Sequence, residues 1–126
     1  MPDASAVLSA SGVTKRYGDV RALDGITLAV AAGECVALVG ESGSGKTTLL
    51  RCFNRLVEPE NGNVQVRERD IRDLDPVTLR RQTGYVPQEG GLLPHWSVLR
   101  NVELVPWLGH APDARALALE ALSLVG

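Results

Sequence analysis

The chain has 126 residues, of which 44 % are hydrophobic and 22 % charged, and its formal net charge at pH 7 is −2. These values are ordinary for a globular domain with one core. The charge argues against nucleic acid as the main partner, because proteins that bind a phosphate backbone usually present a basic face. No apolar run reaches the roughly 18 residues of a membrane span, and the N-terminus carries no signal-peptide pattern. We therefore expect a cytoplasmic protein.

Seven arginines between residues 51 and 81 are the candidate for a local basic patch. Acidic residues alternate with them, which is typical of a solvated surface of mixed charge. The two cysteines, Cys35 and Cys52, have no metal or redox spacing and are interpreted as small core residues in a reducing compartment. The arginines are Arg51, Arg55, Arg67, Arg69, Arg72, Arg80 and Arg81.

The first part of the chain predicts three strands. One lies within residues 7–17 and ends at the turn Gly18-Asp19. In the second, Ile26, Leu28 and Val30 alternate with other residues, the pattern of a half-buried strand. Because a short turn joins these two strands, we expect an antiparallel β layer packed beside a parallel sheet. The apolar run 35–39 predicts a central strand of that sheet, buried on both faces.

A glycine-rich loop follows this strand and matches the phosphate-binding pattern G-x-x-x-x-G-K-[ST]. Glycine lets the backbone curl so that N–H groups converge on a polyphosphate, and the next helix adds its positive end. The alternative is a turn that merely connects a strand to a helix, but the flanking elements favour nucleotide binding. Lys46 would reach the β- and γ-phosphates and Thr47 the Mg²⁺. The predicted nucleotide-binding residues of the loop are Gly40, Glu41, Ser42, Gly43, Ser44, Gly45, Lys46, Thr47 and Thr48.

Helical and turn signals alternate after the loop. An apolar stripe over residues 49–57 predicts a helix, and residues 64–66 a short strand after a turn at 58–62. Asp75 as N-cap and Pro76 at the first helical position predict a helix to Arg81. Residues 84–87 should be extended, because Pro87 excludes the helical region for its predecessor.

Two further helices are predicted near the end of the chain. Ser97 would cap a short helix over residues 98–102, which Pro106 and Gly109 would keep from continuing. Residues 113–125 form the second, opened by Pro112. That helix is apolar on more than one side, so we expect it to pack between partners.

Several separated stretches resemble one family, the ATP-binding subunits of ABC transporters. The resemblance covers residues 8–126 and rests on the phosphate loop and four further segments: residues 13–18, 54–59, 84–88 and 93–98. It implies an α/β fold, the P-loop NTPase core of an ABC ATPase domain with an antiparallel β layer and the start of the helical subdomain. Residues 1–88 would form the nucleotide-binding core with its β subdomain, and residues 89–126 the Q-loop and the start of the helical subdomain.

The resemblance also assigns roles outside the loop. Tyr17 matches the aromatic residue that stacks on adenine, since a flat ring accepts any base; otherwise it is a tyrosine packed at a strand end. Gln88 matches the glutamine that senses Mg²⁺ and the attacking water, so the Mg²⁺ residues implied are Thr47 and Gln88. Residues 89–95 would contact a membrane permease, and a second ATP-binding subunit would complete a dimer. His95 and His110 are interpreted as surface or packing residues.

Residues 54–59, 73–81 and 102–108 are most similar to importers of glycine betaine and other quaternary-amine osmoprotectants. The expected function is binding of ATP and Mg²⁺ to drive solute uptake from the inner face of the cell membrane. Import of another small solute, such as an amino acid, is the alternative substrate class. The transported solute would not contact this subunit, so its identity is inferred by association only.

The chain departs from the family in two ways. Glu68 stands where the family has a glycine in a hairpin turn, which puts the shape of that turn in question. No signature motif, no Walker B Asp-Glu and no switch histidine occur, so we expect an incomplete domain, its C-terminal half absent, that is inactive and poorly folded alone. The rival interpretations are a non-catalytic nucleotide-binding fragment and, more weakly, a small P-loop kinase.

Overall fold

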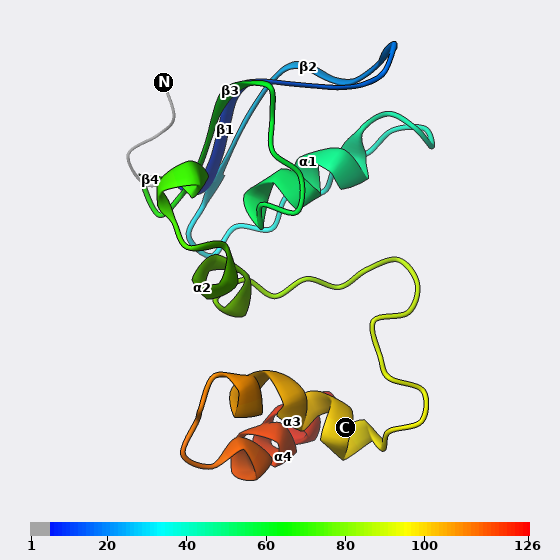
Figure 1. The fold of residues 1–126 in the computed structure, drawn as a ribbon, viewed down its shortest axis with the longest axis vertical. Coiled ribbons are helices and arrows are strands. Elements are labelled where there is room, and N and C mark those ends of the chain that lie inside the picture. The colour runs from blue at the N-terminus through cyan, green and yellow to red at the C-terminus, as the bar shows by residue number, and fades with distance from the viewer. Residues whose placement is uncertain (1–5) are drawn as a thin grey trace. The chain divides into compact units, whose positions relative to one another are not determined.

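The computed structural model describes residues 6–126. They form two compact units, of which the first ends at Thr83 and the second is Gly84–Gly126. The first holds the sheet and the helix that follows the glycine loop, and the second holds two longer helices (Figure 1). The elements are β1 (Ala6–Tyr17), β2 (Val20–Ala31), α1 (Lys46–Phe53), β3 (Asn61–Val66), β4 (Arg69–Asp70), the 3-10 turn Ile71–Asp73, α2 (Pro76–Arg81), α3 (Val98–Leu108) and α4 (Ala114–Val125).

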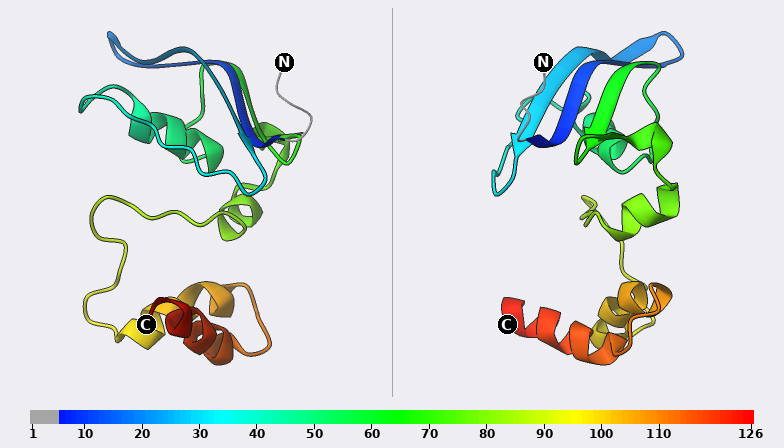
Figure 2. Two further views of the ribbon diagram at one scale, coloured as in Figure 1. Left: turned by 180° about the vertical axis from the view of Figure 1, so that it is seen from behind. Right: turned by 90° about the vertical axis from the view of Figure 1, so that its left-hand side faces the viewer.

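The sheet of the first unit is antiparallel throughout its described strands, in the order β2-β1-β3-β4 (Figure 2). β1 and β2 form a hairpin whose last pair is Tyr17 with Val20, closed by the predicted turn at residues 18 and 19. Ile26, Leu28 and Val30 are half-buried, as their alternation predicted. The predicted antiparallel β layer is confirmed.

The core of this unit lies between the sheet and α1. Ala10, Val13 and Val64 from the sheet pack in one cluster with Leu49 and other residues of α1. Cys52 of α1 is fully buried in that cluster, and burial raises the pKa of its thiol. The interpretation of Cys52 as a small core residue is therefore confirmed.

The predicted buried strand at residues 35–39 is wrong for the part of the chain that the structure describes. These residues form no ladder, Cys35 is exposed, and the Val39 side chain is 94 % exposed. A strand requires a neighbour that takes its backbone hydrogen bonds. All pairs among the described strands are antiparallel and none involves residues 35–39. The apolar run therefore forms no strand. The prediction that Cys35 is a core residue is also wrong, because Cys35 is exposed.

The predicted apolar stripe runs past the true end of α1. Asn54 caps the helix, and Arg55 takes a left-handed conformation with φ 58°. The N–H of Leu56 then donates to the carbonyl of Arg51 (2.9 Å) and that of Arg55 to Cys52 (3.2 Å). This is a Schellman ending, which satisfies carbonyls that a helix end otherwise leaves unpaired. Because the chain turns there, Leu56 does not continue the buried face of α1 and is 50 % exposed.

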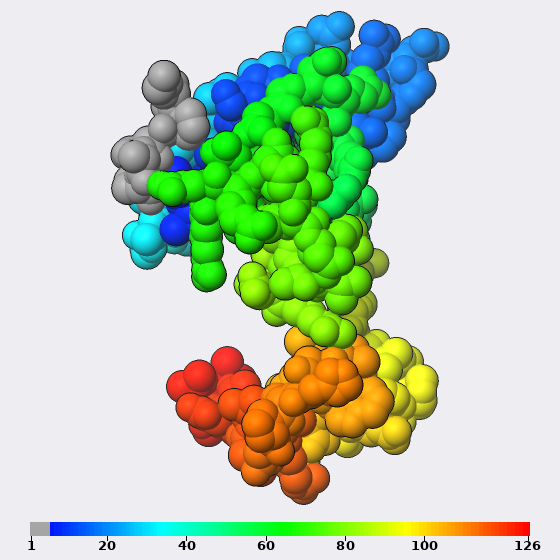
Figure 3. Space-filling view, turned by 60° about the vertical axis from the view of Figure 1, so that its left-hand side comes forward, coloured from blue at the N-terminus to red at the C-terminus, as the bar shows by residue number. Residues whose placement is uncertain are grey.

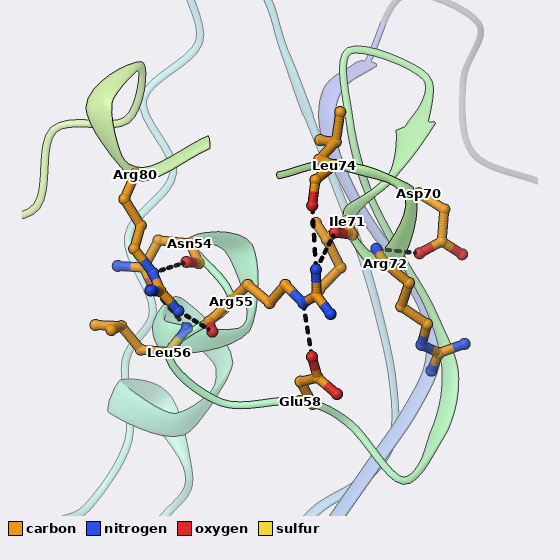
Figure 4. Close-up of polar contacts among 9 residues, drawn as sticks. All are labelled: Asn54, Arg55, Leu56, Glu58, Asp70, Ile71, Arg72, Leu74 and Arg80. Carbon is orange, nitrogen blue, oxygen red and sulfur yellow. Dashed lines mark hydrogen bonds and ion pairs between the residues drawn. The ribbon is translucent and has the colours of Figure 1, made fainter. Parts of the chain in front are cut away.

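Arg55 and Arg80, which were expected on a solvated mixed surface, are instead bound to backbone carbonyls (Figure 4). Arg80 of α2 donates to the carbonyls of Asn54 (3.1 Å) and Arg55 (2.7 Å). Arg55 donates to the carbonyl of Leu74 (3.1 Å) and pairs with Glu58 (2.6 Å), with its side chain only 21 % exposed. The two guanidinium groups thus tie the C-terminal end of α1 to the segment around α2.

The turn between β3 and β4 consists of Arg67 and Glu68, with φ angles of 49° and 65°. Two-residue hairpins favour such left-handed pairs because their twist matches that of the strands. The absence of a glycine at Glu68 therefore leaves the hairpin in place. Because Arg67 and Glu68 each have a Cβ, their left-handed backbone conformation costs free energy.

The second unit is a pair of packed helices. Ser97 accepts a hydrogen bond from the N–H of Arg100 (3.2 Å), so the predicted cap exists. Asp113 accepts one from the N–H of Ala116 (2.9 Å) and is the N-cap of α4, a cap that was not predicted. The prediction that α3 ends near residue 102 is wrong, because Pro106 lies inside the helix, which continues to Leu108. Pro106 has no N–H to donate, but it lies in the last turn, where the carbonyls of Val105 and Pro106 still accept from Gly109 and Ala111.

Replacing the strained turn by Arg67→Asn with Glu68→Gly should raise the free energy of unfolding by about 1 kcal/mol, because asparagine and glycine adopt positive φ readily. Chemical denaturation of both proteins measures this difference. The control pair Arg67→Gln with Glu68→Gln removes the same charges without relieving the backbone and should change little. An equal gain in the control would contradict the explanation by strain.

The cap of α2 makes stability depend on pH in a defined direction. Hydrogen bonds from the Thr78 hydroxyl and N–H lower the pKa of Asp75. A carboxyl whose folded pKa is lowered stabilises the protein above its unfolded pKa of about 3.9, and this contribution is lost as the pH falls through the folded pKa. Wild type should therefore lose stability relative to Asp75→Asn, which keeps a cap but does not titrate, as denaturation is measured from pH 6 to pH 3. A difference independent of pH would contradict this.

Candidate functional site

The glycine loop joins the extended segment 35–39 to α1. Gly43 and Gly45 have φ angles of 83° and 91°, in the left-handed region that favours glycine. The N–H of Ser44 donates to the carbonyl of Glu41 at 3.1 Å, so the loop curls back on itself. Gly45 occupies the N-cap position of α1 but has no side chain that could accept hydrogen bonds from the first N–H groups of the helix. Those donors and the positive end of the helix therefore remain available to an anion.

Gly45 is required by space as well as by backbone angle, and Gly40 has little room for a side chain. A Cβ on Gly45 would lie 2.2 Å from the carbonyl oxygen of Ala22 in β2. One on Gly40 would lie 2.8 Å from the Ser44 hydroxyl oxygen and 3.8 Å from the Lys46 ammonium nitrogen. The loop is thus packed against the β1–β2 hairpin on one side and around the lysine on the other.

The Lys46 ammonium group lies at the centre of the loop. It donates to the carbonyls of Gly40 (2.7 Å) and Glu41 (2.6 Å) and to the hydroxyl of Ser44 (2.9 Å). An ammonium has three donors, and here each has an acceptor. Lys46 therefore holds the loop in its curled form from within, with its charge placed beside the free end of α1.

A cavity of about 290 Å³ opens beside this loop. The loop contributes Ser44, Gly45 and Lys46 to its wall, and the rest is apolar. No carboxylate lines it, so an anion placed there meets amides, a hydroxyl and an ammonium without a repelling charge. The other lining residues are Leu23, Ile26, Ala37, Leu38, Val39 and Leu49.

The residues present fit a bound polyphosphate. A side chain on Gly40 would crowd the curled loop, and no side chain caps the helix end. The Ser42 and Thr47 side chains are exposed next to it. Residues 6–126 contain no group of three or more His, Cys, Asp or Glu side chains able to hold a metal ion. A magnesium ion here would therefore need oxygen ligands from the nucleotide and water in addition to Thr47.

Tyr17 lies at the end of β1 beside the turn of the β1–β2 hairpin, whose blue atoms form a projecting corner of the first unit in Figure 3. The residue is 50 % exposed, and the centre of its ring lies 5.4 Å from the ammonium nitrogen of Lys15. The ring is thus available for stacking rather than packed in the core. Lys15 was not singled out from the sequence; its position two residues before an aromatic strand end was the available signal.

Gln88 belongs to the second unit, and its side chain is exposed. Residues 84–91 have no helix or strand, as predicted for this segment. The segment that follows is held by Asn101, whose side chain accepts from the N–H of Leu93 (2.7 Å) and donates to the carbonyls of Leu93 (3.1 Å) and Ser97 (3.0 Å). His95 packs edge to face against Trp96, with 6.2 Å between the ring centres.

A family model described as "ABC transporter" matches residues 23–126. The chain is 41 % identical over 122 residues to the choline transport ATP-binding protein OpuBA of Bacillus subtilis, which covers 94 % of this chain and 32 % of that protein. It is 46 % identical over 97 residues to the carnitine transport ATP-binding protein OpuCA of Listeria monocytogenes, covering 76 % and 24 %. The chain thus spans about a third or less of the length of these relatives.

Among solved structures, the chain is similar to a dimeric post-hydrolysis state of the ATP-binding cassette MJ0796 bound to ADP and Pi. The TM-score is 0.77 at 32 % sequence identity, and the match covers 92 % of this chain and 56 % of that one. This likeness confirms the predicted fold, the P-loop core of an ATP-binding cassette with its antiparallel β layer.

The site predicts different consequences for two neighbouring glycines. Gly45→Ala should lower the free energy of unfolding by about 2 kcal/mol or more, because it combines positive φ with a clash against Ala22. Gly43→Ala is the matched control: its φ is also positive but nothing lies within 4 Å of the added carbon, so it should lose about 1 kcal/mol. Chemical denaturation measures both. Equal losses would contradict the close approach of the loop to β2.

Proposed function

Because the chain belongs to the ABC transporter family, we propose that it is the nucleotide-binding part of an importer's energy-coupling subunit, and that MgATP binds at residues 40–48. The observation that carries the proposal is the curled loop, with its uncapped helix end and its central Lys46. Converging N–H groups and a positive side chain are what a triphosphate needs, and the pattern of residues that makes them occurs in one continuous loop.

Each proposed role follows from the chemistry of a side chain. Lys46 exchanges its loop carbonyls for β- and γ-phosphate oxygens, and the hydroxyl of Thr47 is a ligand for Mg²⁺. The exposed ring of Tyr17 stacks on adenine. Gln88 places a neutral amide, both donor and acceptor, at the Mg²⁺ and the attacking water. The nucleotide supplies the phosphoryl group whose transfer to water releases the energy for transport.

The proposed solute is a quaternary amine such as glycine betaine. The relatives OpuBA and OpuCA, by their names, serve choline and carnitine transport. A methionine import protein, MetN of Mesorhizobium japonicum, is 41 % identical over 133 residues, covering 99 % of this chain and 36 % of that protein. It supports an amino acid as the alternative solute.

The proposed partners are a membrane permease, contacted through residues 89–95, and a second ATP-binding subunit. Among residues 6–126, no helix combines the length and apolarity needed to cross a bilayer. We therefore propose attachment to the inner face of the membrane through the permease. The dimeric form of the MJ0796 cassette supports the second partner.

For residues 1–126 by themselves we propose nucleotide binding without turnover. Hydrolysis needs a group that activates water and carboxylates that hold the metal, and no carboxylate lines the loop cavity. A non-catalytic nucleotide-binding module is thus the second candidate function, and it shares the same site. Steady-state release of phosphate from MgATP that disappears in Lys46→Ala would contradict the absence of turnover.

The binding proposal is tested with Lys46→Ala. Isothermal calorimetry of the folded chain with MgATP should show saturable binding that weakens at least about a hundredfold in this variant, because a phosphate contact and the internal tie of the loop are lost together. Arg69→Ala removes one positive charge from β4 of the same unit, where the side chain is exposed and has no proposed contact with the nucleotide, and should weaken binding less than about tenfold. No measurable affinity of the wild-type chain, or equal losses in the two variants, would contradict the proposed site.

A further inference from the structure

The second unit contains a cavity of about 370 Å³ that the nucleotide site does not use. Its volume lies at the lower end of the roughly 300–1,000 Å³ found for small-molecule sites. Four of its lining residues come from α3 and recur at helical spacing, so that they share one face of that helix. The lining residues are Trp96, Arg100, Glu103, Leu104, Trp107 and Ala114.

Two of the lining residues of this cavity are tryptophans, Trp96 and Trp107. The guanidinium of Arg100 lies over the Trp96 ring, with its central carbon 4.2 Å from the ring centre, so the ring already holds a cation in the geometry of a cation–π contact. The Trp107 side chain is 67 % exposed. Large exposed aromatic rings beside a cavity are unusual for a side chain that serves only the core.

The cavity wall also carries one charge of each sign. Glu103 lies one helical turn from Arg100, and its side chain is largely buried. Its ion pair with Arg115 is long, 4.0 Å between the closest atoms, and the Arg115 side chain is 67 % exposed. Such a pair is weak, so the carboxylate of Glu103 is available to a second cation.

We propose that this cavity binds a small zwitterion that carries a quaternary ammonium group and a carboxylate, the chemistry of a betaine. The carboxylate pairs with the guanidinium of Arg100, which remains stacked on Trp96. The ammonium group lies against the indole of Trp107 and near the carboxylate of Glu103. Aromatic faces recognise quaternary ammonium groups because their charge is diffuse and weakly hydrated.

The charge pattern selects against simpler ligands. A cation without a carboxylate is repelled by Arg100, and an anion without an ammonium group is repelled by Glu103, whose pair with Arg115 is weak. Glycine has both charges but a small, strongly hydrated ammonium that gains less from an indole face. The proposed ligand is betaine free in solution and not solute in transit through the permease, and its site makes no use of the phosphate loop. The proposal therefore stands or falls separately from transport and from ATP binding.

The test is titration of the purified chain with glycine betaine, followed by calorimetry and by tryptophan fluorescence, with folding checked by circular dichroism. We expect saturable binding that is at least about tenfold weaker in Trp107→Ala and in Arg100→Gln. Val105→Ala is the matched control, an exposed residue of α3 outside the cavity wall, and should bind as wild type does. Lys46→Ala should also bind betaine normally.

The relative affinities for betaine, tetramethylammonium and glycine give a second test. They would not change if Arg100 only stabilised the fold. Tetramethylammonium should bind more weakly than betaine in wild type and more tightly in Arg100→Gln than in wild type, because the repelling charge is gone. Glycine should bind at least about tenfold more weakly than betaine. No saturable binding of betaine by folded chain, equal affinity for glycine, or unchanged affinity in both variants would overturn the proposal.

Discussion

The site depends on the hydrogen bonds that the ammonium group of Lys46 donates to its own loop. Lys46 donates to two carbonyls and a hydroxyl within 2.9 Å, and each acceptor belongs to the turn that precedes the lysine. A charged donor with three short partners in a loop of glycines supplies order that the glycines themselves do not. The same contacts fix the free N–H groups of α1 and the lysine's charge on one side of the loop, where a polyphosphate would use both.

Other contacts in the first unit fix the position of α1, and most of them lie at its C-terminal end. The helix is short, and a short helix needs tertiary contacts to hold it. Leu49 and Phe53 are buried against the sheet, Arg55 ends the helix in a left-handed turn, and Arg80 binds the two carbonyls exposed there. The Gly45 backbone meets β2 at the opposite end. The anion-binding end of the helix is thus positioned by contacts at both of its ends.

Features that depend on neighbouring residues were predictable from the sequence, and features that depend on distant partners were not. The caps at Asp75 and Ser97 are each set by residues three positions apart, and the contacts of Lys46 within the phosphate loop by residues at most six positions apart, and the structure has all of them. The apolar run 35–39 was misassigned, because whether a strand forms depends on a hydrogen-bonding neighbour elsewhere in the chain. The roles of Arg55 and Arg80 were missed for the same reason, since their acceptors lie up to 26 residues away. The Trp96–Trp107 cavity likewise exists only once the chain has folded around α3.

The most direct test of the account follows the backbone amides themselves. In a ¹⁵N-labelled chain titrated with MgADP, the largest chemical-shift changes should fall on the amides of residues 42–48, because their N–H groups are the proposed ligands of the phosphates. Changes concentrated there, at nucleotide concentrations where calorimetry shows binding, would establish the loop as the site. A folded chain whose loop amides do not respond, or which responds only elsewhere, would contradict the central claim.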